Sequence, residues 1–278
     1  MTEQQRFDGQ TVFMTGGSRG IGLAIAQKLA GEGANIAFVA KTDTPDPRLP
    51  GTVHTAAAAI EEAGGSALPI VGDIRDDAAV ASAVEQTVER FGGIDIVVNN
   101  ASAIALQGIG QLPAKRYDLM QDINSRGTFT VLSAALPELL ESSQPRVLTL
   151  SPPLNLDPKW FAQHAPYTLS KYGMTMLTIG VAEQYREQKI AANCLWPRTL
   201  IATAAVQNVV GGDEAMRAAR RPEIMADAAA EVLARSADEA TGECFVDEEV
   251  LRQAGVTDFS RYLHEGATEE SLGQDLFL

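Results

Sequence analysis

The feature that most constrains the fold of this chain is a regular alternation of short apolar runs with longer amphipathic stretches. The runs, of which IDIVVNN is one, are almost continuously apolar, which is typical of strands covered on both faces. The stretches between them are rich in Ala, Leu, Glu and Gln, which favour helices. We expect strands at residues 11–15, 35–40, 67–72, 94–99, 146–150, 190–196 and 243–246, and helices at 20–31, 52–63, 76–91, 114–141, 167–188 and 222–235. This order predicts a parallel sheet with helices on both faces.

Two segments interrupt the alternation. Residues 42–51 read TDTPDPRLPG, and three prolines in ten residues predict an irregular loop. Residues 248–278 follow the last expected strand and are acidic, but they contain Phe259, Tyr262 and Phe277. We therefore expect an α/β protein with a single doubly wound Rossmann-type domain and a seven-stranded parallel sheet at residues 1–247. The acidic extension at 248–278 is expected to pack on that domain or on a neighbouring subunit.

The charge balance bears on the partners of the chain. Lys and Arg number 22 against 36 Asp and Glu, a formal net charge of −14, which argues against nucleic acid and anionic membranes as partners. A local basic pocket could still hold an anionic cofactor. The sequence begins without a signal-peptide pattern and has no apolar run of about 18 residues, so we expect a cytoplasmic protein. Three scattered histidines and two cysteines without CxxC spacing predict no metal site.

A glycine-rich turn follows the first expected strand. The segment GGSRGIG joins strand TVFMT to the first helix, and glycines there allow a phosphate to approach the backbone at a helix N-terminus. The alternative is a glycine-rich turn without a ligand. We interpret the segment as a pyrophosphate site. Its candidate cofactor-binding residues are Gly16, Ser18, Arg19, Gly20, Ile21 and Gly22.

The spacing Thr-Gly-x3-Gly-x-Gly resembles the first turn of the short-chain dehydrogenase/reductase family, and the resemblance covers about residues 8–247. It implies that Asp73 and Ile74 line an adenine pocket after the third strand. The segment Asn99-Asn100-Ala101-Ser102 is similar to the family's Asn-Asn-Ala-Gly motif, which makes Asn99 and Ala101 cofactor-adjacent. By the same resemblance, Pro197 and Thr199 follow the sixth strand beside the nicotinamide, although Arg198 replaces the usual Gly.

The end of the second strand indicates which nicotinamide cofactor is bound. A site for NAD usually places a carboxylate there, whereas the 2′-phosphate of NADP needs a cation. The strand ends at Ala40 and is followed by Lys41, and Arg19 lies in the glycine turn. These residues favour NADP(H) over NAD, with Lys41 as a phosphate ligand. Asp43 is the counter-argument, because it could take the place of the missing acid.

The candidate chemical residues are Tyr167 and Lys171, which share one face of an expected helix. A lysine ammonium beside a tyrosine favours the phenolate, which allows general acid–base catalysis on an alcohol or a carbonyl. The pair matches the Tyr-x3-Lys signature of the resembled family. That resemblance implies that Tyr167 exchanges a proton with substrate and that Lys171 also binds the nicotinamide ribose. It further implies that Asn124, in DINSRGTF, holds a water for proton relay.

The serine of the signature is less regular. Ser151 is followed by two prolines where the family usually has a second, catalytic serine, so Ser151 reaches the site only if the loop shifts. SPPLNLDPKWFAQHAPYTLSKYGM and LWPRTLIATAA resemble a branch of the family whose members carry a sterol-carrier domain, which implies a lipid-like substrate. Trp160, Phe161 and His164 precede the tyrosine, and they either line a substrate pocket or anchor the loop.

The leading hypothesis is a short-chain oxidoreductase that transfers a hydride between NADP(H) and a small-molecule carbonyl or secondary alcohol. The alternatives are an NADP-binding sensor or scaffold without redox turnover, and the same fold performing a dehydration or an epimerisation. In the resembled family the two long helices, here 114–141 and 167–188, usually pair across subunits. That implies a homodimer or a homotetramer.

Overall fold

The computed structural model describes residues 5–45 and 51–278. Their strands form one seven-stranded sheet in the order β3-β2-β1-β4-β5-β6-β7, and every neighbouring pair is parallel. The order runs outward in both directions from the β1–β4 pair, which defines a doubly wound fold. The predicted Rossmann-type α/β architecture is confirmed.

The strands lie within two residues of their predicted bounds. They are β1 (Thr11–Thr15), β2 (Asn35–Ala40), β3 (Ser66–Val71), β4 (Ile96–Asn99), β5 (Arg146–Thr149), β6 (Ala191–Trp196) and β7 (Cys244–Val246). In β1, β4, β5 and β6 every residue is buried, as their continuously apolar sequences require in a sheet with two covered faces.

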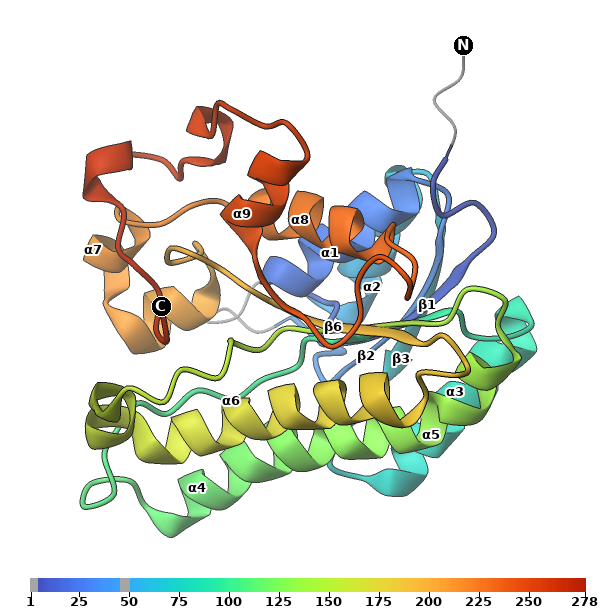
Figure 1. Cartoon of the computed structure of the whole chain (residues 1–278), viewed down its shortest axis with the longest axis horizontal. Helices are drawn as coiled ribbons and strands as arrows, with labels where there is room; N and C mark the ends of the chain where they lie inside the picture. Colours follow the sequence, from blue (N-terminus) through green and yellow to red (C-terminus); the bar gives the residue numbers. More distant parts are fainter. Residues whose placement is uncertain (1–4, 46–50) are drawn as a thin grey trace.

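Helices cover the two faces of the sheet (Figure 1). The first face carries α1 (Gly20–Gly31), α2 (Val53–Glu62), α8 (Glu223–Leu233) and α9 (Asp247–Gln253). The second face carries α3 (Asp77–Phe91), α4 (Ala114–Gln121), α5 (Gly127–Glu141) and α6 (Pro158–Gln184). The short helix α7 (Gly212–Met216) lies in the connection between β6 and α8. The alternation therefore produces three layers, helix–sheet–helix.

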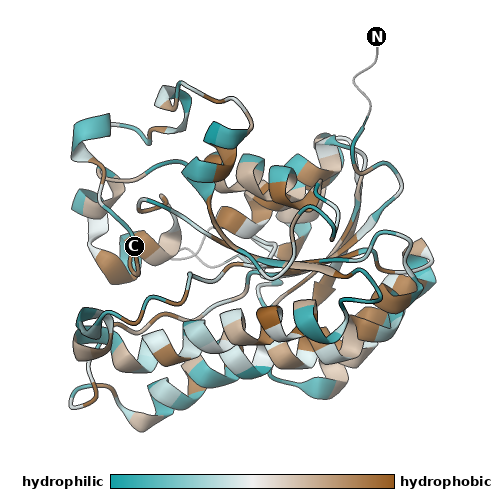
Figure 2. Ribbon diagram, in the orientation of Figure 1, coloured by the Kyte–Doolittle hydropathy of each residue, from teal (hydrophilic) through white to brown (hydrophobic). Residues whose placement is uncertain are grey.

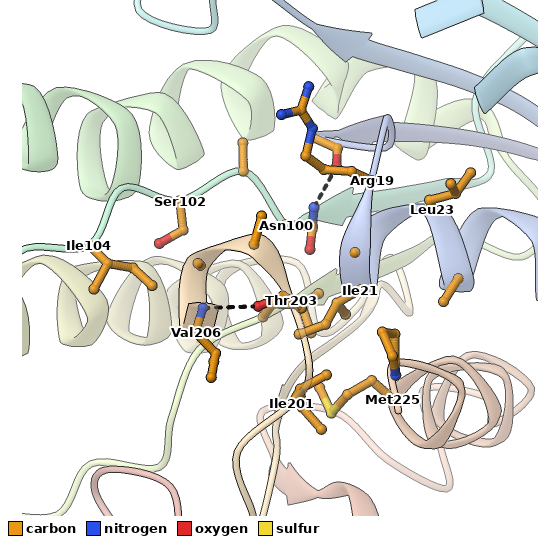
Figure 3. Close-up of a pocket in the computed structure, with 18 of the residues that line it drawn as sticks. Arg19, Ile21, Leu23, Asn100, Ser102, Ile104, Ile201, Thr203, Val206 and Met225 are labelled. Carbon is orange, nitrogen blue, oxygen red and sulfur yellow. Dashed lines mark hydrogen bonds between the residues drawn. The ribbon is translucent and has the colours of Figure 1, made fainter. Parts of the chain in front are cut away.

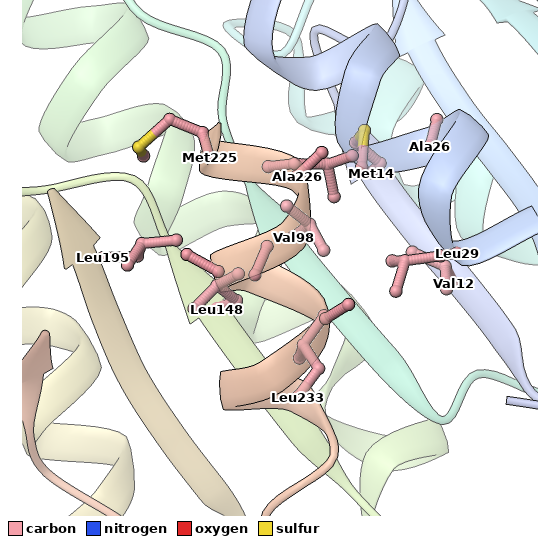
Figure 4. Close-up of a cluster of buried hydrophobic side chains, with 14 of the residues drawn as sticks. Val12, Met14, Ala26, Leu29, Val98, Leu148, Leu195, Met225, Ala226 and Leu233 are labelled. Carbon is pink, nitrogen blue, oxygen red and sulfur yellow. The ribbon is translucent and has the colours of Figure 1, made fainter. Parts of the chain in front are cut away.

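A separate apolar core lies on each face of the sheet. On the first face, Leu29 of α1 and Leu233 of α8 pack over Val12, Val98 and Leu148 of the central strands (Figure 4). The second core joins the opposite strand faces to α3, α5 and α6. Brown apolar residues alternate with teal polar ones along the covering helices (Figure 2), as expected for helices with one buried side.

Helix α6 differs most from its prediction, because it begins at Pro158 and not at Tyr167. Its backbone departs from helical geometry at His164, two residues before Pro166. A proline inside a helix lacks the N–H donor and collides with the preceding turn, so the helix is kinked there. Tyr167 thus opens the straight part of α6, and the segment before it is helical where a loop was expected.

The long helix predicted at 114–141 contains one irregular turn. Between α4 and α5 the chain forms a π-helical turn, η1 (Asp122–Arg126), which contains Asn124. Such turns widen the helix locally and often occur at functional sites. No helix in the described part of the chain is long and apolar enough to cross a membrane.

The segment after β7 packs on the domain. It contains α9 and two single 3-10 turns, η3 (Ser260–Tyr262) and η4 (Glu269–Ser271). The rings of Phe259, Tyr262 and Phe277 are all buried. The final stretch descends between α7 and α6 to the end marked C in Figure 1. These three buried aromatic side chains anchor the acidic segment.

Candidate active site

One cavity of about 1320 Å³ lies at the carboxyl ends of the central strands. Its walls come from the glycine turn, the ends of β2, β3, β4 and β6, helix α6 and the connection after β6. In open parallel sheets ligands bind at this edge, where the strand order reverses. The predicted site residues that line the cavity are Gly16, Ser18, Arg19, Gly20, Ile21, Lys41, Asp73, Ile74, Ala101, Tyr167, Lys171 and Pro197.

The glycine turn presents the N-terminus of α1 to this cavity. No side chain caps that helix, and its first turn contains no acidic residue. Gly16 has a φ of 73°, a left-handed value that favours glycine. Uncapped N–H groups and the helix dipole together make an anion site.

Asn100 holds the turn in shape, a role that the sequence interpretation did not assign. Its Nδ2 donates to the backbone oxygens of Thr15 (3.0 Å) and Gly16 (2.9 Å), and Figure 3 shows it beside the cavity. A Cβ at Gly22 would approach that nitrogen to 2.5 Å and the Gly16 oxygen to 2.4 Å. Gly22 is therefore required for packing behind the turn and does not line the cavity.

Two more predicted cofactor residues lie behind the cavity wall. Asn99 is buried, and its Nδ2 donates to Thr149 Oγ1 at 3.4 Å. Thr199 is buried and forms a bridge with Gln274. Neither lines the cavity, and the contacts predicted for them with a cofactor stay predictions. Of the two neighbouring asparagines, Asn100 is the one that faces the site.

The cations at the end of β2 differ in their partners. The Arg19 guanidinium donates to Thr42 Oγ1 (2.7 Å) and to the Gly51 carbonyl (3.0 Å), so its charge faces neutral groups. Lys41 Nζ lies 3.4 Å from Asp73 Oδ2. Hydrogen bonds from Arg75 are the main reason that the pKa of Asp73 falls to about 2.

Asp43 does not take the position of the missing acid. Its Oδ1 lies 2.7 Å from His54 Nε2, and it is not among the residues that line the cavity. The argument that Asp43 could bind a ribose hydroxyl is therefore not supported by the geometry.

Tyr167 and Lys171 both lie on the cavity wall, one helical turn apart on α6. Lys171 Nζ donates to the Leu150 carbonyl at 2.6 Å and lies 5.2 Å from the Trp196 ring centroid. Burial lowers the pKa of Lys171 to about 7. Burial also raises the pKa of the Tyr167 phenol, and the Asp275 carboxylate adds to that rise. In the protein alone, desolvation thus outweighs the acidifying effect expected from the lysine.

Comparisons with known proteins agree with this geometry. Residues 10–213 match the family model described as short chain dehydrogenase. The chain belongs to the short-chain dehydrogenase/reductase family. Two solved relatives are a putative dehydrogenase from Xanthomonas campestris (51% identity, TM-score 0.93, 98% of each chain) and a short chain dehydrogenase from Mycobacterium thermoresistibile (55%, 0.91, 98% of this chain and 96% of the other).

The branch of the family that the sequence resembles is also confirmed. Hydroxysteroid dehydrogenase-like protein 2 from Danio rerio is 52% identical over 257 residues, and the human protein of that name is 48% identical over 257 residues. Both alignments cover 92% of this chain and 61% of the relative. The chain therefore spans about three fifths of the length of these curated relatives.

Asn124 is fully buried in the π-helical turn, so it is not a helix-surface amide. Its Oδ1 accepts from Ala103 N at 2.8 Å, and its Nδ2 donates to Ala103 O (3.0 Å) and Ser170 Oγ (2.9 Å). The side chain thus ties the loop after β4 to α6. The water-holding role implied by the family stays a prediction.

Ser151 is the one predicted catalytic serine, and it does not line the cavity. Its side chain is fully buried beside the thiol of Cys194, and its hydroxyl has no hydrogen-bond partner in the described chain. The next residue, Pro152, is bound through its carbonyl, which accepts from the Thr175 hydroxyl at 2.8 Å.

The residues before Tyr167 anchor their segment. The Trp160 ring packs 5.4 Å from that of Phe277, and His164 Nδ1 lies 2.8 Å from the Leu106 carbonyl oxygen. Neither Trp160 nor His164 lines the cavity. Arg198 is likewise turned away and pairs with Glu249. Among the described residues, no cluster of three or more His, Cys, Asp or Glu side chains is arranged to hold a metal ion.

Two walls of the cavity extend beyond the candidate site residues predicted from sequence. The connection after β6 contributes Ile201, Thr203 and Val206, and Thr203 Oγ1 accepts from Val206 N at 3.4 Å (Figure 3). The segment Gln274–Leu276, far along the acidic extension, closes the other side. The sequence LWPRTLIATAA drew attention to the connection after β6. For Gln274–Leu276, the only indication in the sequence was the neighbouring aromatic residue Phe277.

Proposed function

We propose that the chain is an NADP(H)-dependent oxidoreductase that interconverts a carbonyl and a secondary alcohol on a hydrophobic small molecule. The observation that carries the proposal is a single cavity with an uncapped helix N-terminus and two cations at one end, and Tyr167 with Lys171 at the other. A nicotinamide dinucleotide needs these two environments within one site.

The residues present fit a dinucleotide with a 2′-phosphate. The α1 N-terminus suits the pyrophosphate, and Ile74 offers an apolar surface to the adenine. Arg19 is held beside the end of β2 by neutral partners, which leaves its charge available to a phosphate. With Asp43 engaged by His54, no described carboxylate occupies the usual ribose position directly after β2.

The bound nicotinamide would supply or accept the hydride, and the protein supplies the proton. With its pKa raised by burial, the Tyr167 hydroxyl is protonated at neutral pH and suited to donate to the oxygen of a substrate carbonyl. In the oxidative direction the same oxygen must accept a proton, which requires a positive charge nearby. Lys171, held by the Leu150 carbonyl, is the residue placed to provide it.

The substrate end of the cavity favours an apolar molecule. Its walls include Ile104, Leu106, Leu200, Ile201 and Met216. Hydrophobic pockets with a few polar groups bind apolar ligands through surface burial. Hydroxysteroid dehydrogenase-like relatives at about half identity point in the same direction, so we propose a lipid-like carbonyl or alcohol.

Turnover of a panel of ketones and hydroxyacyl compounds with NADPH tests the proposal. We expect wild type to oxidise NADPH with at least one of them and Tyr167→Phe to be slower by about 100-fold or more. Tyr117→Phe, in an exposed tyrosine of α4 outside the cavity, is the matched control and should keep full activity. Equal rates for wild type and Tyr167→Phe would refute the mechanism. Tight NADPH binding without oxidation across the panel would favour a sensor or scaffold, and product analysis separates dehydration or epimerisation from redox.

We also propose self-association through α5 and α6. These helices lie side by side on the second face (Figure 1) and expose Phe129, Leu140, Leu169 and Met176. Large exposed apolar side chains on neighbouring helices are typical of an interface. A second copy of the chain is the proposed partner, and a monomeric mass by light scattering would contradict it.

A further inference from the structure

The segment Gln274–Phe277 is built into the active site by contacts along its length. Gln274 forms an antiparallel bridge with Thr199, and Asp275 N donates to the Arg198 carbonyl at 3.0 Å. Trp196 Nε1 donates to the Leu276 carbonyl at 2.9 Å. These bonds join the segment to the chain just after β6, where the nicotinamide end of the proposed site lies.

Phe277 fixes the segment against the tyrosine. Its ring is fully buried and lies 6.1 Å from the Tyr167 ring, in a stacked arrangement with an interplanar angle of 29°. The rings of Tyr172 (5.4 Å) and Trp196 (5.9 Å) pack on other sides of it, and Asn155 Nδ2 donates to its carbonyl at 3.0 Å. Such a cluster leaves the backbone of Asp275 little freedom to move away.

Asp275 therefore contributes a carboxyl group to the wall that also contains Tyr167 and Lys171. Trp196 connects the two sides, because Lys171 Nζ lies over its ring while its Nε1 binds the residue next to Asp275. Asp275 Oδ1 accepts from Leu276 N at 2.7 Å, which fixes the orientation of the carboxyl group. Lys171 forms no direct ion pair with a carboxylate of the described residues, so Asp275 acts on it through the longer-range attraction of opposite charges.

We propose that Asp275 is the counter-ion of Lys171: a positioning carboxylate that helps the buried lysine stay protonated while Tyr167 exchanges its proton. The proposal rests on the proposed function for its catalytic meaning, but the electrostatic relation can be measured without turnover. An opposite charge nearby favours the ammonium form, whereas burial alone favours the neutral amine.

Lys171 and Asp275 each shift the pKa of the other in the direction that favours their charged forms. Burial lowers the pKa of Lys171, whereas Cys194 and then Asp275 raise it. Burial raises the pKa of Asp275 to about 7, and Lys171 acts to lower it. The other ionisable groups that act on the pair are Tyr167 on α6, the thiol of Cys194 on β6, and Asp247 at the start of α9. Asp247 raises the pKa of Asp275, and its Oδ1 is occupied by the N–H of Arg198 and of Glu248.

The test is the titration midpoint of Lys171, read from the ¹³Cε shift in full-length, lysine-labelled protein without ligand. The signal is assigned with Lys171→Arg. In Asp275→Asn the amide oxygen can still accept from Leu276 N, so the turn is kept while the charge is removed. We expect the midpoint to fall by about one pH unit. Asp275→Glu, which keeps the charge, should restore most of the shift.

Asp258→Asn is the matched control. Asp258 Oδ1 also accepts from a backbone N–H two residues on, that of Ser260 at 2.9 Å, but Asp258 is exposed and outside the cavity. Its substitution should leave the Lys171 midpoint unchanged. Equal midpoints in wild type and Asp275→Asn would overturn the proposal, and so would an equal shift in Asp258→Asn. Should Asp275→Asn not fold, Asp275→Glu with an unchanged midpoint, compared with Asp275→Ser with a lowered one, decides the same question.

A second readout separates this proposal from the proposed function. If turnover is found, the high-pH limb of kcat/KM that reports loss of the lysine proton should move to lower pH in Asp275→Asn. A shifted Lys171 midpoint without any turnover would support the counter-ion and refute the oxidoreductase. Turnover with an unshifted Lys171 midpoint would support the oxidoreductase and refute the counter-ion.

Discussion

Replacing Arg19 by Ala should weaken the binding of NADPH much more than that of NADH. The Arg19 guanidinium is already held by Thr42 Oγ1 and the Gly51 carbonyl, and neither partner neutralises its charge. A charge-assisted hydrogen bond to the 2′-phosphate contributes about 1.5–3 kcal/mol. That corresponds to a rise in Kd for NADPH of about 10- to 150-fold.

Lys41 should matter less, for two reasons that the structure supplies. Its side chain is 56% exposed, and its Nζ already lies 3.4 Å from the Asp73 carboxylate. Exposed charge pairs contribute about 0.2–1 kcal/mol, so Lys41→Ala should raise the Kd for NADPH by no more than about fivefold. Both residues are cations at the end of β2, so charge alone does not distinguish them. The prediction that Arg19→Ala weakens NADPH binding more than Lys41→Ala therefore depends on their different partners and exposure.

The assay is calorimetric titration of each variant with NADPH and with NADH at fixed ionic strength. NADH lacks the 2′-phosphate, so its Kd should change less than about threefold in Arg19→Ala. A parallel loss for both dinucleotides would mean that Arg19 shapes the glycine turn and does not read the phosphate. Tighter binding of NADH than of NADPH by wild type would refute the cofactor proposal itself.

Three further results are expected. Phe277→Ala removes a fully buried ring that stacks on Tyr167, and it should lower the free energy of unfolding by up to about 3–5 kcal/mol in urea denaturation; no loss at all would contradict the packing. Asn100→Ala removes the donor to Gly16 O and should weaken NADPH and NADH equally, so a loss confined to NADPH would be inconsistent. Burial raises the pKa of Asp247 to about 6, so its contribution to stability is present below pH 4 and is lost as the pH rises through 6. Asp247→Asn should therefore flatten the decline of Tm between about pH 4 and pH 6, and an unchanged slope would count against it.

The sheet was predictable because its signal is local. A strand buried on both faces must be apolar along its whole length, and IDIVVNN meets that condition without reference to the rest of the chain. The glycine turn and the Tyr167–Lys171 pair are local in the same sense, since their spacing alone brings the residues to one surface.

Elements whose structure depends on distant contacts were missed or misread. The helix was predicted to begin at Tyr167 after a loop, but packing of Trp160 on Phe277 supports a helical turn before Pro166. Whether Asn99 or Asn100 faces the cavity depends on the direction in which each side chain points at the end of β4. The motif itself does not contain that information. No sequence pattern predicts that Asp275 lies in the active site, because its position is determined by bonds to the region after β6.

The anchoring of Phe277 also has a consequence for how the protein is made. Its carbonyl is bound by Asn155, 122 residues earlier in the chain. Contacts over such separations form late, because the intervening chain must be ordered first. During synthesis the sheet can assemble while Tyr167 still lacks its stacking partner, so a nascent chain would acquire its fold before its complete catalytic wall. Catalytic competence would then arise in a separate step, after the sheet has formed.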